Sequence, residues 1–165
     1  MLSEKLLTAL NEQINNELFA AYQYLAMVEY FAARNLDGFA HWMRLQRQEE
    51  INHAMKIFDF VIDRDGRVNL GAIAAPDAKF TTPLGVLKKA LEHERSVTGK
   101  INALYAAAKK ENDYPTEALM QWFVLEQVEE EASALKLVER LEMAGDDKAA
   151  LLILDREVGQ RTSTE

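Results

Sequence analysis

Four segments of this sequence place apolar residues at alternating steps of three and four, which is the spacing of helices packed in a bundle. The breaks between them lie at 34–38, 63–82 and 112–115, and the fourth segment ends at Gly145. The first and third breaks are short, whereas about seventeen residues without periodicity follow the second segment, which is long for a compact domain. The pattern therefore predicts two antiparallel helix hairpins joined by one crossover along the bundle.

The composition leaves little room for other structure. With 7 glycines and 3 prolines among 165 residues there is little material for turns, and 48% hydrophobic content suffices for one core. We expect a single all-α domain over 1–165, with the bundle at about 3–144 and a short fifth helix at about 146–159. The fifth helix carries an apolar run at 149–154, which favours burial in an assembly.

Three of the predicted helices begin at residues that commonly cap a helix N-terminus. Ser3 precedes the first segment and Asp37 precedes the second. Thr82 precedes the third and is followed by Pro83, a residue favoured at the first helical position. These residues are the expected N-caps.

Each of the four apolar seams contains one acidic residue, and the second also contains a histidine. A carboxylate isolated in a bundle core costs several kcal/mol, so four of them would offset most of a domain's net stability of about 5–15 kcal/mol. No seam position holds Lys or Arg. The neutralising charge is therefore expected to come from protons or a bound metal. The residues are Glu17, Glu50, His53, Glu94 and Glu130.

Four carboxylates and one imidazole match two divalent cations in charge. Oxygen ligands with a single nitrogen suit iron or manganese better than a closed zinc site, and di-metal sites of this type occur in bundle cores. We expect Glu50 to bridge both ions, with Glu17 and His53 completing one site. Glu94 and Glu130 are expected to complete the other.

Two more polar residues share the inward faces, and two histidines do not. Tyr24 lies two turns from Glu17 on the same face, where a hydrogen-bonded core phenol is the simplest interpretation. Gln127 is expected beside the metal ligands, as an amide rather than a strong ligand. His41 and His93 fall outside the seams and are expected at the surface.

A second group of acids lies beside the predicted metal pair. Glu126 and Glu129 share one flank of the fourth helix with Glu130, and Glu49 lies on the corresponding flank of the second. On the residues alone, a solvated acidic edge explains such a cluster. We refer to Glu49, Glu126 and Glu129 as the outer acids.

Charge and apolar surface indicate the kinds of partner. A balance of 27 acidic and 19 basic residues, net -8, disfavours nucleic acid. The most apolar stretch, 18–33, contains Gln23 and Glu29 and is too short to span a membrane. The absence of cysteine and of a signal-peptide pattern favours a cytoplasmic protein. Self-association is expected because aromatic side chains lie outside the first seam, at Phe19, Tyr22 and Tyr30.

Taken as a set, these motifs resemble those of the bacterial non-haem ferritins across essentially the whole chain. The resemblance implies a ferroxidase centre that oxidises Fe(II) with O2 or H2O2, inside a shell of twenty-four subunits that stores ferric mineral. It also implies a third iron position at the outer acids, and a role for Tyr24 as ligand neighbour or electron donor. The matching residues are Glu17, Tyr24, Glu49-Glu50-x-x-His53, Glu94 and Glu126-Gln127-x-Glu129-Glu130, together with the crossover and fifth helix.

Two alternatives remain. A haem-containing bacterioferritin would carry Glu-x-x-His on the fourth helix, where this chain has Gln127 to Glu130. Asn52 occupies the place expected for that family's haem-binding methionine, with Met55 a turn away, so no haem is expected. A non-catalytic helical scaffold would explain the seams but gives no reason for an acid in each.

Overall fold

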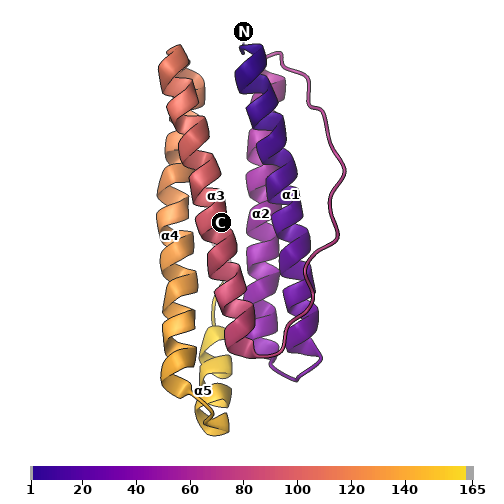
Figure 1. The fold of residues 1–165 in the computed structure, drawn as a ribbon, viewed down its shortest axis with the longest axis vertical. Helices are drawn as coiled ribbons and strands as arrows, with labels where there is room; N and C mark the ends of the chain where they lie inside the picture. The colour runs from indigo at the N-terminus through magenta and orange to yellow at the C-terminus, as the bar shows by residue number, and fades with distance from the viewer. Residues whose placement is uncertain (1, 163–165) are drawn as a thin grey trace.

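The structure is a computed structural model that describes residues 2–162, and these form five α-helices and no strand. The four long helices make a bundle, with α1 antiparallel to α2 and α3 antiparallel to α4 (Figure 1). This confirms the all-α fold with one long crossover. The helices are α1 Glu4–Ala32, α2 Asp37–Asp63, α3 Pro83–Glu111, α4 Tyr114–Ala144 and α5 Lys148–Val158.

Side-chain caps define most of the helix starts. Ser3 Oγ accepts from the Leu6 amide at 3.1 Å, and Thr82 Oγ1 accepts from the Gly85 amide at 3.0 Å, so both predicted caps are confirmed. The prediction for Asp37 is wrong: it is the first residue of α2, and Leu36 occupies the N-cap without a side-chain hydrogen bond.

The missing cap of α2 comes from the other end of the chain. Asp155 Oδ1, on α5, accepts from the Phe39 amide at 2.9 Å. The approach is close, because a Cβ on Gly38 would lie 1.7 Å from the Asp155 carbonyl oxygen. Glycine at position 38 therefore allows α5 to dock on the start of α2.

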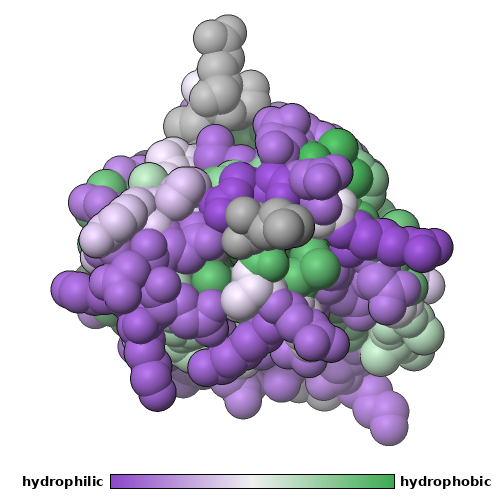
Figure 2. Space-filling model, turned by 90° about the horizontal axis from the view of Figure 1, so that it is seen from above, coloured by the Kyte–Doolittle hydropathy of each residue, from purple (hydrophilic) through white to green (hydrophobic). Residues whose placement is uncertain are grey.

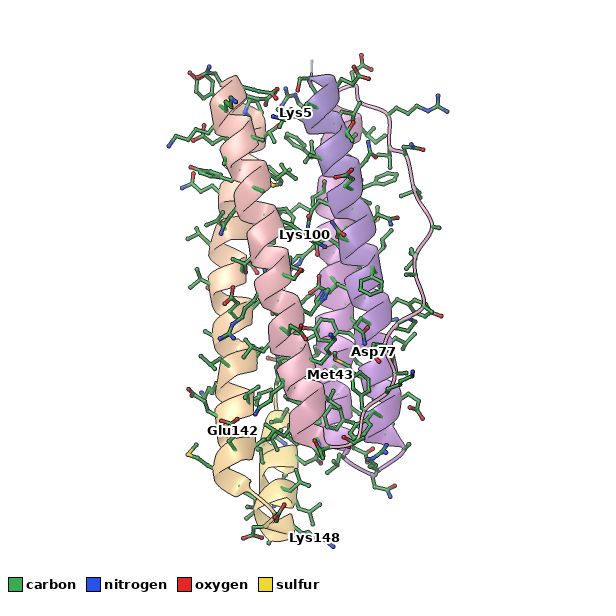
Figure 3. All side chains as sticks on the ribbon, viewed as in Figure 1. Lys5, Met43, Asp77, Lys100, Glu142 and Lys148 are labelled. Carbon is green, nitrogen blue, oxygen red and sulfur yellow. The ribbon has the colours of Figure 1, made fainter. Side chains whose placement is uncertain are left out.

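The crossover, residues 64–82, lies along the outer side of α1 (Figure 1). Amide side chains of α1 hydrogen-bond its backbone. Asn11 donates to the Arg67 carbonyl at 3.1 Å, and Gln23 both donates to the Asp77 carbonyl at 2.7 Å and accepts from the Asp77 amide at 2.9 Å. Asp77 is labelled beside α1 in Figure 3. These bonds satisfy backbone groups that have no secondary-structure partner.

The apolar interior consists of two clusters, one on either side of the seam acids along the length of the bundle. One cluster contains Leu10, Ile14, Ile57 and Phe123, and the other contains Phe31, Met43 and Leu87. In each helix the seam acid falls between residues of the two clusters, as Glu17 does between Ile14 and Tyr24. The packing of both clusters therefore fixes the height at which all four acids meet.

The surface prediction for the aromatic residues of α1 is wrong for Tyr30. Tyr30 is only 3% exposed, and its ring packs edge-on against Phe80 of the crossover at 5.8 Å. Phe19 is partly buried and lies 6.2 Å from the His93 ring, centroid to centroid, whereas Tyr22 remains 46% exposed. The crossover and α3 cover much of this face within the subunit.

The bundle end at which α1 begins carries mostly polar side chains (Figure 2). On α5, Leu154 is buried, whereas Leu152 and Ile153 are 60% and 62% exposed. The apolar run at 149–154 is therefore only partly covered by its own subunit. None of the described helices combines the length and apolarity needed to cross a bilayer.

Candidate metal centre

The four predicted seam acids are all buried inside the bundle, one from each long helix. Glu17 of α1, Glu50 of α2 and Glu94 of α3 are at most 1% exposed, and Glu130 of α4 is 7% exposed. His53, one turn after Glu50, is also buried. Because each residue sits at a seam position, helix packing turns all five side chains inward.

Glu17, Glu50 and His53 form the first candidate ion site. One ligand atom from each lies within 4.8 Å of the others, and His53 Nδ1 is 3.7 Å from Glu50 Oε2. Gln13 Nε2 donates to Glu17 Oε1 at 2.7 Å. The other oxygens, Glu17 Oε2 and Glu50 Oε2, are buried and accept no hydrogen bond from the described residues. Unsatisfied carboxylate oxygens at this depth are costly, and a cation would satisfy them.

Glu94 is held by two of the predicted polar neighbours. The Tyr24 hydroxyl donates to Glu94 Oε1. Gln127 Nε2 lies 3.3 Å from Glu94 Oε2 and donates to the Glu94 carbonyl at 3.2 Å, with Thr98 Oγ1 also within 3.3 Å. The structure thus places Tyr24 and Gln127 on the same carboxylate, from opposite helices.

Glu130 belongs to a second group of potential ligands, together with His53 and Glu126. Gln46 Nε2 donates to Glu130 Oε2 at 2.7 Å. Glu126, one of the outer acids, therefore lies with two of the predicted ligands of the pair. Glu94, expected as the partner of Glu130, is not part of this group.

The other outer acids lie in different surroundings. Glu49 is paired with Arg161, whose Nη2 lies 2.9 and 2.8 Å from its two carboxylate oxygens. Glu129 is exposed. No seam position holds Arg, yet an arginine from outside the four seams reaches this region, because Arg161 follows α5 and extends back to α2.

Burial raises the pKa of the buried carboxyl groups. For Glu130 the pKa rises to about 8, with burial as the main cause and repulsion from Glu94 added. The pKa of Glu94 rises to about 7, again through burial, although hydrogen bonds from Tyr24 and Gln127 act to lower it. Burial, then Glu94 and Glu17, raise the pKa of Glu50 well above its usual value. Without a cation the cluster therefore retains protons near neutral pH.

Aromatic rings enclose the His53 side of the centre. The Trp122 and Phe123 rings lie edge-on to His53, with centroids 5.6 and 5.5 Å away. The Lys56 ammonium lies 4.2 Å from the Trp122 centroid. These rings restrict the orientation of the imidazole and limit water around it.

The two other histidines are less exposed than expected. His41 is partly buried, and its Nε2 lies 2.9 Å from the Arg161 carbonyl oxygen. His93 is also partly buried, near Tyr24 at 6.3 Å between ring centroids. Burial lowers the pKa of His93 to about 4. The surface prediction is therefore wrong for both.

Sequence reasoning missed the residues that orient the acids. Gln13 lies one turn before Glu17 and donates to it, so a polar residue at i−4 of a seam acid was a usable signal there. Gln46 offered no such signal, because it donates to Glu130 of α4 rather than to Glu50 on its own helix. Arg161 offered no such signal, because its contacts depend on how α5 docks.

A donor set of hard oxygen atoms with one imidazole fits iron or a similar divalent cation. The unsatisfied oxygens of Glu17 and Glu50 beside His53 are the specific observation behind that fit. A cation held there would displace protons from the raised-pKa acids and would be shielded from bulk water. The arrangement is therefore a candidate site for a cation that prefers hard oxygen ligands.

Comparison with known proteins gives the family. A family model described as a ferritin-like domain matches residues 7–144. The bacterial non-heme ferritin of Bacteroides fragilis (strain 638R) is 42% identical over 161 residues, covering 98% of this chain and 100% of that protein. That of Staphylococcus aureus (strain MRSA252) is 39% identical over 165 residues, covering 100% and 99%.

Solved structures agree with the sequence relatives. An open pore ferritin from the hyperthermophilic archaeon Archaeoglobus fulgidus is 50% identical with a TM-score of 0.96, covering 98% of this chain and 100% of that chain. A structure described as a humanized archaeal ferritin is 50% identical with a TM-score of 0.98 and covers both chains completely. The family model spans residues 7–144 of the bundle, and the relatives extend through α5. This chain therefore belongs to the ferritin family.

Proposed function

We propose that this protein stores iron and oxidises Fe(II) with O2 or H2O2 at a di-iron centre within each subunit. The observation that carries the proposal is the buried group of Glu17, Glu50 and His53, with two carboxylate oxygens that accept no hydrogen bond from the described residues. Family membership supports the same conclusion. The ferric product is stored inside a shell of twenty-four subunits.

The carboxylates have two tasks in this proposal. They bind two ferrous ions, with Glu50 bridging, Glu17 and His53 completing one position, and Glu94 and Glu130 completing the other. As hard anionic ligands they also stabilise the ferric state more than the ferrous state. Two Fe(II) ions supply two electrons, which with two protons reduce O2 to H2O2, or H2O2 to two water molecules.

Proton release accompanies iron binding. Glu94 and Glu130, with pKa values of about 7 and 8, hold protons in the metal-free centre at neutral pH. Iron must displace these protons, because only the carboxylate binds the ion. The protons are then available beside the oxidant that consumes them.

The outer acids and Tyr24 have supporting roles. Glu126 lies with His53 and Glu130 and is positioned to share an ion, which supports a third iron position next to the pair. Tyr24 donates its hydrogen bond to Glu94 and is the nearest phenol to that ligand. It orients the Glu94 carboxylate and can serve as an electron donor.

The direct test is aerobic addition of Fe(II) to metal-free protein, followed by ferric absorbance. We expect oxidation much faster than in buffer, and loss of most of that rate in Glu50→Ala and His53→Ala. Glu12→Ala, an exposed acid on α1, serves as the matched control and is expected to keep the wild-type rate. Oxidation no faster than in buffer, or unchanged in the two variants, contradicts the ferroxidase proposal.

The shell is tested separately by size. Gel filtration and light scattering are expected to give a particle of twenty-four subunits, because Tyr22, Leu152 and Ile153 leave exposed apolar surface on the isolated subunit. A monomer or simple dimer under mild conditions contradicts the shell.

A further inference from the structure

The residues that follow α5 contact α2 through Arg161. Arg161 is held there from two sides. Its carbonyl oxygen lies 2.9 Å from His41 Nε2, and its guanidinium carbon lies 5.1 Å from the centre of the Trp42 ring. Because a carbonyl only accepts, His41 Nε2 donates this bond. Arg161 is therefore fixed against the first half of α2.

The guanidinium of Arg161 connects to Glu130 through one intermediate side chain. Its Nη2 donates to both oxygens of Glu49, and its Nη1 donates to Gln46 Oε1. Gln46 is completely buried, and its Nε2 donates to Glu130 Oε2 at 2.7 Å. A continuous hydrogen-bonded path thus runs from the C-terminal segment to a buried carboxylate of α4.

The direction of this path follows from the donors available. A guanidinium can only donate, whereas an amide presents an acceptor at one end and a donor at the other. Gln46 therefore has to turn its oxygen toward Arg161, which turns its NH2 group toward Glu130. In the opposite orientation two donors would face each other, and the amide oxygen would face the carboxylate.

We propose that Arg161 is a positioning residue of the metal centre, which acts through Gln46 to fix the Glu130 carboxylate. Gln46 engages Glu130 Oε2, so Oε1 is left for an ion. The Arg161 guanidinium itself donates to Gln46 and Glu49. The inference rests on the proposed function in one respect, namely that Glu130 binds a metal.

Anchoring of α5 does not by itself explain these contacts. Asp155 already joins α5 to α2 through the Phe39 amide, and Arg140 joins α4 to α5 through Glu157. Arg161 adds an orientation of buried Gln46 that neither of these contacts supplies. Arg140 is therefore a suitable control, because it also joins α5 to the bundle but does not contact Gln46.

The experiment uses Co2+, which is redox-stable and reports its coordination in the visible spectrum. Metal-free wild type, Arg161→Gln, Gln46→Leu, the double variant and Arg140→Gln are titrated with Co2+ as assembled proteins. Loss of a group that orients a metal ligand commonly weakens metal binding 10–100-fold. We expect Arg161→Gln and Gln46→Leu each to weaken one class of Co2+ site about tenfold, with the other class unchanged.

Three comparisons separate positioning from simple docking. The double variant is expected to be no weaker than either single variant, because both remove the same path. Arg140→Gln is expected to bind Co2+ as wild type does. Arg161→Lys keeps a cationic donor on a long side chain, unlike the shorter and neutral Gln, and is expected to recover part of the affinity. Additive losses, equal losses in Arg140→Gln, or wild-type binding by Arg161→Gln would each overturn the proposal.

A crystal structure of metal-free Arg161→Gln provides a readout independent of iron. We expect the Gln46 to Glu130 hydrogen bond to be lost or the amide to turn, and an unchanged bond would overturn the proposal. The two proposals fail differently. Wild type that binds Co2+ in the core but does not oxidise Fe(II) contradicts the ferroxidase function alone. Normal oxidation with wild-type Co2+ affinity in Arg161→Gln contradicts the positioning role alone.

Discussion

The Tyr24 hydroxyl donates a hydrogen bond to the Glu94 carboxylate and so joins α1 to α3 at the metal centre. Burial and the surrounding acids raise the pKa of Tyr24 well above its usual value, so the phenol remains a donor at any working pH. The bond therefore fixes the Glu94 carboxylate whether or not that group is ionised.

Replacing Tyr24 with Phe tests this bond. We expect the variant to fold, and to lose about 1–3 kcal/mol of unfolding free energy at pH 8, where Glu94 is ionised. Iron oxidation should slow about tenfold, as for other groups that orient a metal ligand. Tyr22→Phe, on the exposed side of the same helix, is the control and should change neither quantity. An unchanged oxidation rate in Tyr24→Phe would refute the role.

The raised pKa of Glu130 predicts the pH dependence of stability in the metal-free protein. Its pKa is about 8 in the folded chain, against about 4.3 in an unfolded chain. The neutral form therefore favours the folded state below about pH 4.3, and this contribution is lost as the pH rises through 8.

Glu130→Gln removes that titration while keeping an acceptor for Gln46. As the pH rises from 5 to 8.5, the melting temperature of metal-free wild type should fall. The melting temperature of Glu130→Gln should fall less over the same range. The difference between the two proteins is the measurement, because Glu50 and Glu94 titrate in both. Parallel melting curves across this pH range would contradict the prediction.

Binding of a redox-inert cation should stabilise the protein. Zn2+ at about one hundred times its dissociation constant is expected to add about 2.7 kcal/mol to the unfolding free energy, measured by thermal or denaturant unfolding. The stabilisation should weaken from pH 8 to 6, because protons compete for Glu94 and Glu130. The double variant Glu17→Gln/Glu50→Gln should lose most of this stabilisation, whereas the control Glu12→Gln should keep it. Equal stabilisation in the double variant would place the cation elsewhere.

Asp155→Ala should destabilise the start of α2. The Phe39 amide loses the Asp155 carboxylate as its acceptor, which by analogy with other helix caps costs about 1 kcal/mol. Hydrogen exchange at the Phe39 amide should accelerate, while the far end of the bundle stays unchanged. Asp146→Ala, an exposed acid just before α5, is the control. Equal exchange at Phe39 in both variants would show that Asp155 is not the cap.

The sequence predicted the parts of the site that depend on helix periodicity. Each seam acid lies at the inward position of its own helix, so burial of Glu17, Glu50, Glu94 and Glu130 followed from spacing alone. The pairing among them did not follow, because it depends on rotation and height of helices that are distant in the chain. Among the outer acids, for example, Glu126 lies with His53 and Glu130, whereas Glu49 is paired with Arg161.

Local sequence determined the helices, their main caps and the inward face of each, since a period of 3.6 residues and a cap residue act within a few positions. Tertiary structure decided which groups those faces meet. Docking of α5 gives α2 its cap from Asp155 and brings Arg161 to Gln46 and Glu49. The crossover buries Tyr30, which its place on α1 left outside the seam. Each of these contacts joins segments far apart in the chain, and its geometry exists only once the whole bundle has packed.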